Sequence, residues 1–222
     1  MAEFTLVSAN KNYCLWPLPA WLCLKVAGLE FDEIIIPFGH ADSRKRFEEH
    51  SPSGGVPVLK HGDLTIWESL SICEYVAELV PSANLWPEDK IKRALARTAA
   101  SEMYSGYKSI LSRVMPTNIR RRTGPLDLPE ELQAIVDRNT EIWRDCRKKY
   151  SDEGPFLFGQ FSIADAFHAP LVNRFVTYNV PLGPIETKYR DAVRNQMYVL
   201  EYVALAEAEP WDYERSDRPF SS

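Results

Sequence analysis

The first part of the chain alternates between short apolar runs and amphipathic segments. Phe4 and Leu6 belong to a short predicted strand, and apolar positions recur at helical spacing between Pro17 and Gly28. Proline is tolerated in a first helical turn and glycine is favoured after a last one, so the sequence marks both ends of this helix. Residues 31–36 are rich in β-branched side chains and predict a second strand.

The next segments predict a hairpin enclosed by two helices. Residues 42–49 are charged and indicate a short exposed helix. The apolar runs at 56–59 and 64–67 are separated by a Gly-Asp pair, which favours an antiparallel hairpin, and a helical pattern begins at Ser69. The resulting order is strand, helix, strand, helix, strand, strand, helix, and its first crossover implies a parallel pair of strands.

The rest of the chain is helical in pattern. Residues 81–87 hold two prolines and predict a linker. Helical periodicity then covers residues 90–114, 129–150, 162–177 and 185–209. The tail from Pro210 is polar and aromatic and indicates a packed coil. We therefore expect an α/β plus all-α protein, with a first domain over residues 1–80, a linker over 81–87 and an all-helical domain over 88–222.

Composition and charge narrow the classes of function. The net charge is −5, whereas nucleic-acid binders carry a basic surplus, so we expect no nucleic-acid partner. The sequence has no apolar run of about 18 residues and no basic-then-apolar leader, which indicates no membrane partner and a reducing, cytoplasmic location. The four cysteines are widely scattered and have neither the spacing of metal ligands nor a C-x-x-C pair, so we expect no bound metal. They are Cys14, Cys23, Cys73 and Cys146.

Two positions near the predicted hairpin suit an extended ligand. Pro57 is either a simple strand-entry proline or a cis-proline that presents the Val56 backbone to a peptide. Ser69 is either an N-cap or part of a helix start whose free N–H groups bind a carboxylate. Glu68 beside it offers an acceptor to an ammonium group, so a ligand with an α-amino-acid end would satisfy both charges.

These motifs resemble those of the glutathione transferase family. Residues 51–59, S-P-S-G-G-V-P-V-L, and residues 66–69, I-W-E-S, are similar to the family's glutathione site. Residues 85–87, L-W-P, resemble its interdomain linker, and residues 161–165, F-S-I-A-D, resemble the capping motif of its second domain. The resemblance implies the glutathione transferase fold, an N-terminal thioredoxin-like βαβαββα domain followed by an all-helical C-terminal domain.

The resemblance also assigns roles to residues. It implies that Val56 pairs through its backbone with the cysteinyl unit of glutathione, that Pro57 is cis, and that Glu68 and Ser69 hold the γ-glutamyl end. Glutathione would then be a co-substrate. This chain departs from the family at Gly55, where many relatives carry Lys, Gln or Arg, so the group that holds the glycine carboxylate is open. His40 is a candidate for it.

The position that carries the catalytic group differs as well. Residues 8–19 resemble a bacterial subgroup that reads N-Y-S-S-W-S-L-R-P-W-L, and in that alignment the first serine becomes Cys14. A cysteine just before a helix N-terminus has its thiolate favoured by the helix dipole. The alternative is that Cys14 is a small, inert, buried residue. Tyr13 is the runner-up as a hydroxyl donor, and Ser8 is the third choice.

Other chemistry-bearing residues have plain structural explanations. Cys23 and Cys73 fall on apolar helix faces and are expected in the core. Tyr104 and Tyr107 share a helix face that either lines an acceptor pocket between the domains or packs in the core. The serine and acid within residues 162–165 form a predicted capping box, which stabilises a helix and has no catalytic role.

Three functions remain compatible with these residues. The leading prediction is a glutathione transferase, a detoxification-type enzyme that adds the glutathione thiolate to a small electrophile. The first alternative is a glutathione-dependent thiol transferase or disulfide reductase that uses Cys14. The second is a glutathione-binding or scaffold protein without turnover. The family resemblance also implies a homodimer.

Overall fold

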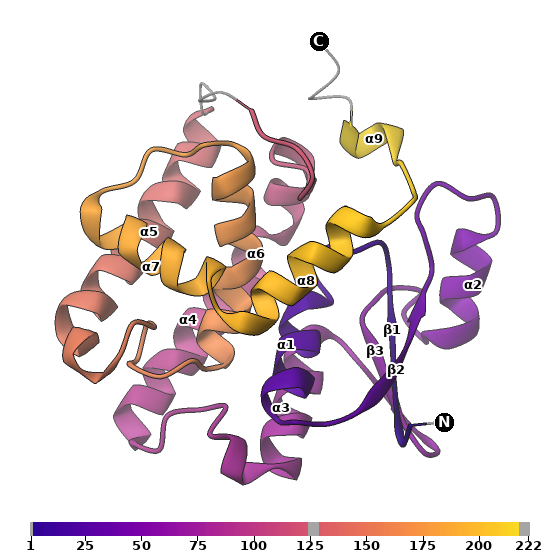
Figure 1. The fold of residues 1–222 in the computed structure, drawn as a ribbon, viewed down its shortest axis with the longest axis horizontal. Helices are drawn as coiled ribbons and strands as arrows, with labels where there is room; N and C mark the ends of the chain where they lie inside the picture. Colours follow the sequence, from indigo (N-terminus) through magenta and orange to yellow (C-terminus); the bar gives the residue numbers. More distant parts are fainter. Residues whose placement is uncertain (1, 124–128, 218–222) are drawn as a thin grey trace.

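The computed structural model describes residues 2–123 and 129–217. Its N-terminal part is a four-stranded sheet with the strand order β2-β1-β3-β4 (Figure 1). The elements are β1 (Phe4–Ser8), α1 (Leu18–Val26), β2 (Phe31–Ile35), α2 (Ser43–His50), β3 (Val58–His61), β4 (Leu64–Trp67) and α3 (Ser69–Leu79). β1 pairs in parallel with β2 and antiparallel with β3, which pairs antiparallel with β4. The predicted parallel crossover and final hairpin are both confirmed.

Helix α1 connects the sheet to the rest of the molecule. It begins after Pro17, whose φ of −69° suits a helix start, and its residues from Leu18 to Leu24 are buried. Gly28, at φ +69°, follows the end of the helix in the left-handed region that glycine tolerates best. α1 packs against α3 on one side and against α6 on the other. The loop before α1 is therefore held close to both parts of the protein.

The second part is helical. Its elements are α4 (Lys90–Val114), α5 (Glu130–Tyr150), α6 (Ile163–Thr177), α7 (Pro184–Arg194), α8 (Met197–Ala208) and α9 (Glu214–Asp217), with short 3-10 turns at Pro81–Ala83 and Ser151–Glu153. α6 runs through the middle of this part and packs against α4 (Figure 1). Among the described helices, none is both long enough and apolar enough to cross a membrane.

Two details of the C-terminal region correct the sequence prediction. Residues 185–209 were expected as one helix, but α7 ends at Arg194 and α8 begins at Met197. The side chain of Gln196 accepts hydrogen bonds from the N–H groups of Tyr198 and Val199, and this N-cap starts a new helix in a new direction. The predicted coil of the tail also contains the short helix α9.

The predicted capping box is present at the start of α6. The Ser162 N–H donates to the Asp165 carboxylate at 2.9 Å, and the Ser162 side chain accepts from the helix backbone in return. The N–H of Leu157 and the hydroxyl of Tyr189 also donate to Asp165, at 2.9 and 3.1 Å. Burial raises the pKa of Asp165 to about 6 in spite of these donors. The pair is thus a structural anchor for the central helix.

Candidate functional site

The hairpin edge leaves one backbone segment without partners. The peptide bond between Val56 and Pro57 is cis, as the family resemblance implies. The N–H and C=O of Val56 form no hydrogen bond with any described residue. The β3–β4 pairing ends where Val58 lies opposite Trp67, so Val56 lies two residues before this pairing and Ser69 two residues after it. Free peptide groups therefore border the start of α3, where an extended ligand can pair with them.

The start of α3 has the features of an anion site. Glu68 precedes the helix at φ +71°, and its exposed side chain makes no capping hydrogen bond. The first helical N–H that bonds backwards belongs to Ile72, so the N–H groups of residues 69–71 have no acceptor among the described residues. Such groups, together with the helix dipole, favour a carboxylate. A carboxylate there would lie next to the Glu68 side chain.

The Ser69 hydroxyl has a different partner from the one expected of a cap. It is 1% exposed and donates to the carbonyl of Trp16 at 2.8 Å. Ser69 is therefore not a side-chain N-cap, because its hydroxyl is directed at the loop before α1. This bond fixes the helix start against the segment that carries Cys14.

Cys14 lies in a tight turn between β1 and α1. Its N–H donates to the carbonyl of Asn10 at 2.8 Å, and the Tyr202 hydroxyl donates to its carbonyl at 3.3 Å. The residue is 7% exposed, and its side chain faces a cleft of about 410 Å³. Trp16, Arg174 and Tyr213 line the same cleft, which lies between the β1–α1 loop, the helical part and the C-terminal segment.

The other cysteines lie away from this cleft. Cys23 and Cys73 are fully buried, which confirms that they belong to the core, and burial holds the pKa of Cys73 well above its usual value. Cys146 is half-buried on α5, where burial raises its pKa to about 11. Ser8 is 1% exposed and donates to Glu33 at 2.9 Å. Of the four cysteines, Cys14 alone lines the cleft.

The hydroxyl of Tyr13 is held by charged neighbours. It donates to the Asp217 carboxylate at 3.0 Å and accepts from Arg120 Nη2 at 2.7 Å. Burial and the hydrogen bond to Asp217 raise the pKa of the Tyr13 phenol. Because its one hydrogen is directed to a carboxylate, Tyr13 is poorly placed to donate to a thiolate. This geometry favours Cys14 over Tyr13 as the group that faces a ligand sulfur.

Other candidate residues lie apart from the cleft. Tyr104 packs edge-on against Trp16 and Phe167, with ring centroids 6.4 and 5.6 Å apart. Tyr107 donates to Glu102 at 3.0 Å, and burial together with that bond raises its pKa to about 12. Neither tyrosine lines the cleft, and both are half-buried and packed against the hydrophobic core.

His40 was the candidate for holding the glycine carboxylate of glutathione. His40 is exposed in the loop before α2. Its N–H donates to the Ser43 hydroxyl and its carbonyl accepts from the Ser43 N–H, whereas its imidazole forms no hydrogen bond with a described residue. No described group of three or more His, Cys, Asp and Glu side chains is arranged to hold a metal ion.

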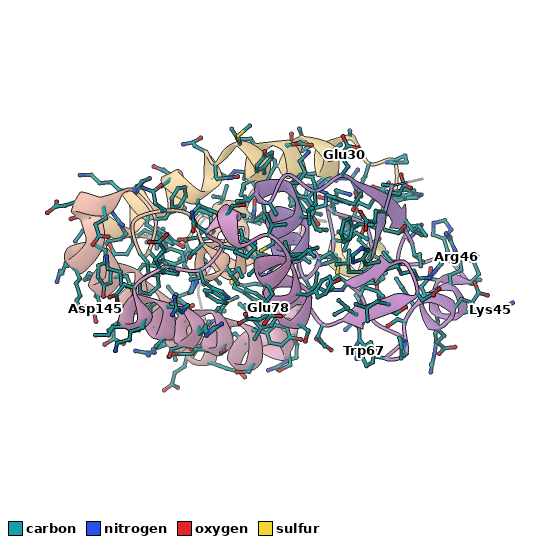
Figure 2. All side chains as sticks on the ribbon, turned by 90° about the horizontal axis from the view of Figure 1, so that it is seen from below. Glu30, Lys45, Arg46, Trp67, Glu78 and Asp145 are labelled. Carbon is teal, nitrogen blue, oxygen red and sulfur yellow. The ribbon has the colours of Figure 1, made fainter. Side chains whose placement is uncertain are left out.

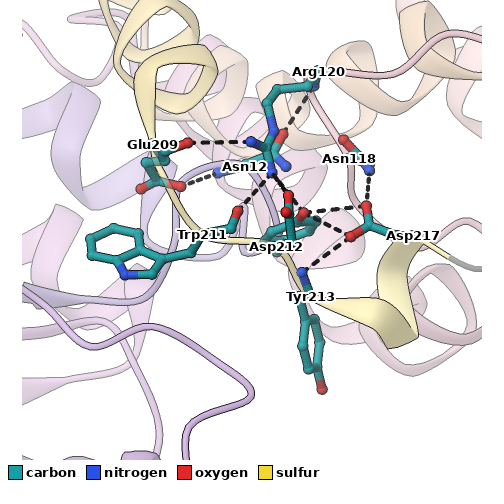
Figure 3. Close-up of polar contacts among 9 residues, drawn as sticks. Asn12, Asn118, Arg120, Glu209, Trp211, Asp212, Tyr213 and Asp217 are labelled. Carbon is teal, nitrogen blue, oxygen red and sulfur yellow. Dashed lines mark hydrogen bonds and ion pairs between the residues drawn. The ribbon is translucent and has the colours of Figure 1, made fainter.

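The C-terminal segment closes one side of the cleft. Arg120 donates to the carbonyl of Trp211 at 2.7 Å and to Asp212 at 3.0 Å (Figure 3). Asn118 donates to Asp217 at 2.7 Å, and this carboxylate also accepts from the Tyr213 N–H at 3.1 Å (Figure 3). Sequence analysis missed this network, because its members lie far apart in the chain and none belongs to a motif.

Glu209 fixes the same segment to the β1–α1 loop. Its carboxylate accepts from the N–H groups of Lys11 and Asn12, at 2.7 and 3.1 Å. The Asn12 side chain in turn accepts from the Arg120 N–H at 2.9 Å (Figure 3). Burial raises the pKa of Glu209 even though both loop donors stabilise its charge. The C-terminal segment thus supports the loop that carries Cys14.

Comparison with known proteins gives the class and then the family. The family model for the N-terminal domain of glutathione S-transferase matches residues 13–79. Glutathione S-transferase 1 of Dianthus caryophyllus is 33% identical over 177 residues, covering 79% of this chain and 78% of the relative. Maleylacetoacetate isomerase of Rattus norvegicus is 28% identical over 191 residues, covering 82% of each chain.

Solved structures agree with these relatives in fold. A glutathione transferase homologue from Burkholderia, solved with bound glutathione, has a TM-score of 0.69 at 22% identity and covers 93% of this chain and 100% of its own. Glutathione transferase Omega 3C from Trametes versicolor has a TM-score of 0.70 at 20% identity and covers 96% and 92%. The architecture is therefore that of the glutathione transferases, a thioredoxin-like domain joined to a helical part. The chain belongs to the glutathione S-transferase family and is a glutathione-dependent transferase or isomerase.

Proposed function

We propose that the protein is a glutathione transferase whose glutathione site is formed by Val56, Pro57, Glu68 and Ser69. The observation that carries the proposal is the pair of unpartnered backbone features that flank the β3–β4 pairing, the Val56 peptide groups before it and the N–H groups at the start of α3 after it. The γ-glutamyl carboxylate would accept from the helix start, and the ammonium group would donate to Glu68. The cysteinyl unit would pair with Val56.

This binding mode directs the ligand sulfur towards the β1–α1 loop. The bond from Ser69 to the Trp16 carbonyl holds that loop against the helix start. Cys14 then donates its S–H to the glutathione thiolate and keeps it available for attack. Glutathione loses its thiol proton to solvent when the thiolate forms. The thiolate sulfur then bonds to the electrophilic carbon of the second substrate, and the displaced electron pair leaves with a departing anion or moves onto a conjugated acceptor that takes up a proton. The apolar wall around Trp16 accommodates the substrate.

A second activity is favoured by the thiol at this position. The Cys14 thiolate can attack the sulfur of a glutathione mixed disulfide, releasing the partner thiol and leaving glutathione bonded to Cys14. The thiolate of a second glutathione then attacks that glutathione sulfur. This step forms oxidised glutathione and regenerates the Cys14 thiolate, so sulfur and electrons balance. The protein would then be a thiol transferase, the alternative that the sequence left open.

The substitution Cys14→Ser separates the two activities. Disulfide reduction should be lost, because a hydroxyl cannot form the mixed disulfide, whereas conjugation should be kept or raised, because a hydroxyl still donates to the thiolate. Both rates would be measured for the wild type, Cys14→Ser and the control Cys146→Ser, which alters a thiol outside the cleft. If Cys14→Ser changes neither rate, Cys14 is structural and the proposed role is wrong.

A further inference from the structure

The walls of the cleft carry an excess of positive charge. Arg113, Arg174 and Arg215 line it, and none of the aspartates and glutamates that the structure describes does. This arrangement contrasts with the chain as a whole, whose net charge is −5. A cavity lined by charges of one sign raises the local concentration of ligands of the opposite sign. The cleft is therefore built for an anion.

Arg174 is the deepest of these cations. It is 2% exposed on α6, and its Nε and Nη1 donate to the carbonyls of Met115 and Pro170 at 2.9 and 3.3 Å. Its guanidinium lies 6.0 Å from the centre of the Trp16 ring. No described carboxylate forms an ion pair or hydrogen bond with it, and no described residue accepts from Nη2.

An unpaired charge at this depth is unusual in proteins. Buried charges are paired or hydrogen-bonded to groups of opposite sign, because desolvation costs several kcal/mol per ion. Lys11, the other deeply buried cation, follows this rule and lies 2.5 Å from Glu33. Burial lowers the pKa of Arg174 to about 10, which still leaves the group charged at neutral pH. Arg174 thus keeps its charge and lines the cleft, and its Nη2 is a donor for which no described residue is an acceptor.

The other two arginines that line the cleft are exposed to solvent. Arg113 is largely exposed and lies 3.0 Å from Glu131, so its charge is already neutralised. Arg215 is exposed on α9. Exposed charges attract a ligand at long range but add little binding energy, whereas a buried guanidinium adds much more. Among the described residues that line the cleft, Arg174 is therefore the one cation at depth.

We propose that Arg174 binds a carboxylate of the second substrate, so that the enzyme acts on small anionic electrophiles. One buried guanidinium neutralises one negative charge, which fits a carboxylate better than a phosphate dianion beside the Trp16 ring. The carboxylate would accept from Nη2, and Cys14 lines the same cleft. The substrate's reactive carbon is thereby directed at the sulfur site. The inference rests on the proposed function for the reaction, but anion binding can be tested without it.

The test uses two alkylating agents that differ by one charge. Iodoacetate and iodoacetamide both transfer a two-carbon group to the Cys14 thiolate, forming an S–C bond and releasing iodide. Mass spectrometry of the Cys14 peptide gives each rate, and the ratio of iodoacetate to iodoacetamide reports on the carboxylate alone. The fraction of thiolate cancels in this ratio, so a change in the thiol pKa does not affect it. No glutathione is needed.

We expect the folded wild type to show a ratio at least about tenfold above that of the urea-unfolded chain, since a charge-assisted hydrogen bond contributes that much. Arg174→Gln should return the ratio to the unfolded value, and Arg174→Lys should keep part of the preference. The control Arg138→Gln should behave as the wild type, because Arg138 on α5 pairs with Glu102 on α4 and does not line the cleft.

The outcomes separate the two ideas. An equal ratio in the folded and unfolded wild type overturns the anion site, as does a folded Arg174→Gln protein that keeps the preference. A cleft in which neither reagent reaches Cys14 also overturns it. If Arg174→Gln does not fold, the wild-type comparison and Arg174→Lys decide. A raised ratio with no conjugation of glutathione to any electrophile supports the anion site and counts against the proposed function alone.

Discussion

At the scale of single residues, the hydroxyl of Ser69 joins the two halves of the candidate site. It is bonded to the Trp16 carbonyl, so the helix start that would hold glutathione and the loop that presents Cys14 share one hydrogen bond. Replacing Ser69 therefore alters both halves at once and gives an ambiguous result. Glu68 is the cleaner position, because its exposed side chain has no partner among the described residues.

We predict that Glu68→Gln weakens glutathione binding by about tenfold. The neutral amide retains a hydrogen-bond acceptor for the ammonium group but loses the charge, and a hydrogen bond to a charged partner contributes more than a neutral one. Calorimetric titration with glutathione would measure the change. The matched control is Glu78→Gln, an exposed residue later on the same helix (Figure 2), which should not change the affinity. Equal affinities for both variants would remove Glu68 from the site.

Residue roles were predictable where they depended on local motifs. The cis bond at Pro57 and the box at Ser162 belong to short patterns, and the structure has both. Arg174 could not be recognised in the same way. On a helix that is buried on every side, a single arginine in the sequence gives no indication of depth, which is set by packing against α1 and α4. Its contact with the Trp16 ring joins residues far apart in the sequence.

At the scale of elements, α6 holds an ionisable group that the site does not use. His168 is fully buried, and its Nδ1 is bonded to the Ala164 carbonyl at 2.9 Å. Its ring packs edge-on against Trp143, and Nε2 has no partner among the described residues. Burial lowers the pKa of His168 to about 4, while Glu102 acts weakly in the opposite direction. The neutral ring is therefore part of the folded state.

This shift predicts a dependence of stability on pH. Between pH 6.5 and 4 the unfolded chain binds a proton at His168 and the folded chain does not, so acid favours unfolding. The free energy of unfolding should fall by about 3 kcal/mol across this range from His168 alone. Denaturant titrations of the wild type and His168→Gln at several pH values would test this.

Comparing the wild type with His168→Gln cancels the contributions of the other ionisable groups to the pH dependence of stability. Asp165 acts in the opposite direction, because its pKa is raised to about 6, and its contribution is the same in both proteins. The free energy of unfolding of the wild type minus that of the variant should therefore fall by about 3 kcal/mol between pH 6.5 and 4. Parallel pH curves for the two proteins would contradict the prediction.

Elements with strong periodicity were predicted closely, and boundaries set by side chains were not. Residues 90–114 were predicted as a helix and form α4 with the same bounds, because the pattern repeats over many turns. The break between α7 and α8 was missed. The pattern continues through Asn195 and Gln196, and only the capping bonds of Gln196 show where the chain turns.

At the scale of the whole molecule, the C-terminal segment forms part of the cleft. Tyr213, Arg215 and Ser216 line it, although they lie far from the sheet in sequence. Arg120 holds this segment through the carbonyls of Glu209 and Trp211. Arg120 therefore joins the β1–α1 loop, through Asn12 and Tyr13, to the C-terminal segment.

We predict that Arg120→Ala loosens the segment and destabilises the protein by about 2 kcal/mol, since it removes hydrogen bonds made by a charged group. Hydrogen exchange should rise in residues 211–217, and the change should extend to the loop at Asn12. Arg138→Ala, which also removes an arginine with ion pairs, should leave exchange in both regions unchanged. Protection that stays the same in Arg120→Ala would show that other contacts hold the segment.

An exposed apolar face suits the homodimer that the family resemblance implies. Leu64, Trp67, Ile91 and Leu95 are 46, 42, 62 and 43% exposed. They lie on β4 and α4, and Figure 2 shows Trp67 at the surface of the molecule. We predict that the protein sediments as a dimer and that Trp67→Glu yields monomers, because a carboxylate on an apolar contact face is costly. The control is Met197→Glu on α8, an exposed position away from this face.

The hydrogen bonds between the β1–α1 loop and the C-terminal segment set an order of folding during synthesis. Asn12 and Glu209 are 197 residues apart in sequence, and Tyr13 and Asp217 are 204 apart. A chain emerging from the ribosome can complete its sheet early, but the support beneath Cys14 cannot form until residues 209–217 have been synthesised. A chain that is cut short before them would lack the finished cleft. The cleft around Cys14 is thus completed last, and a chain that lacks residues 209–217 would not form it.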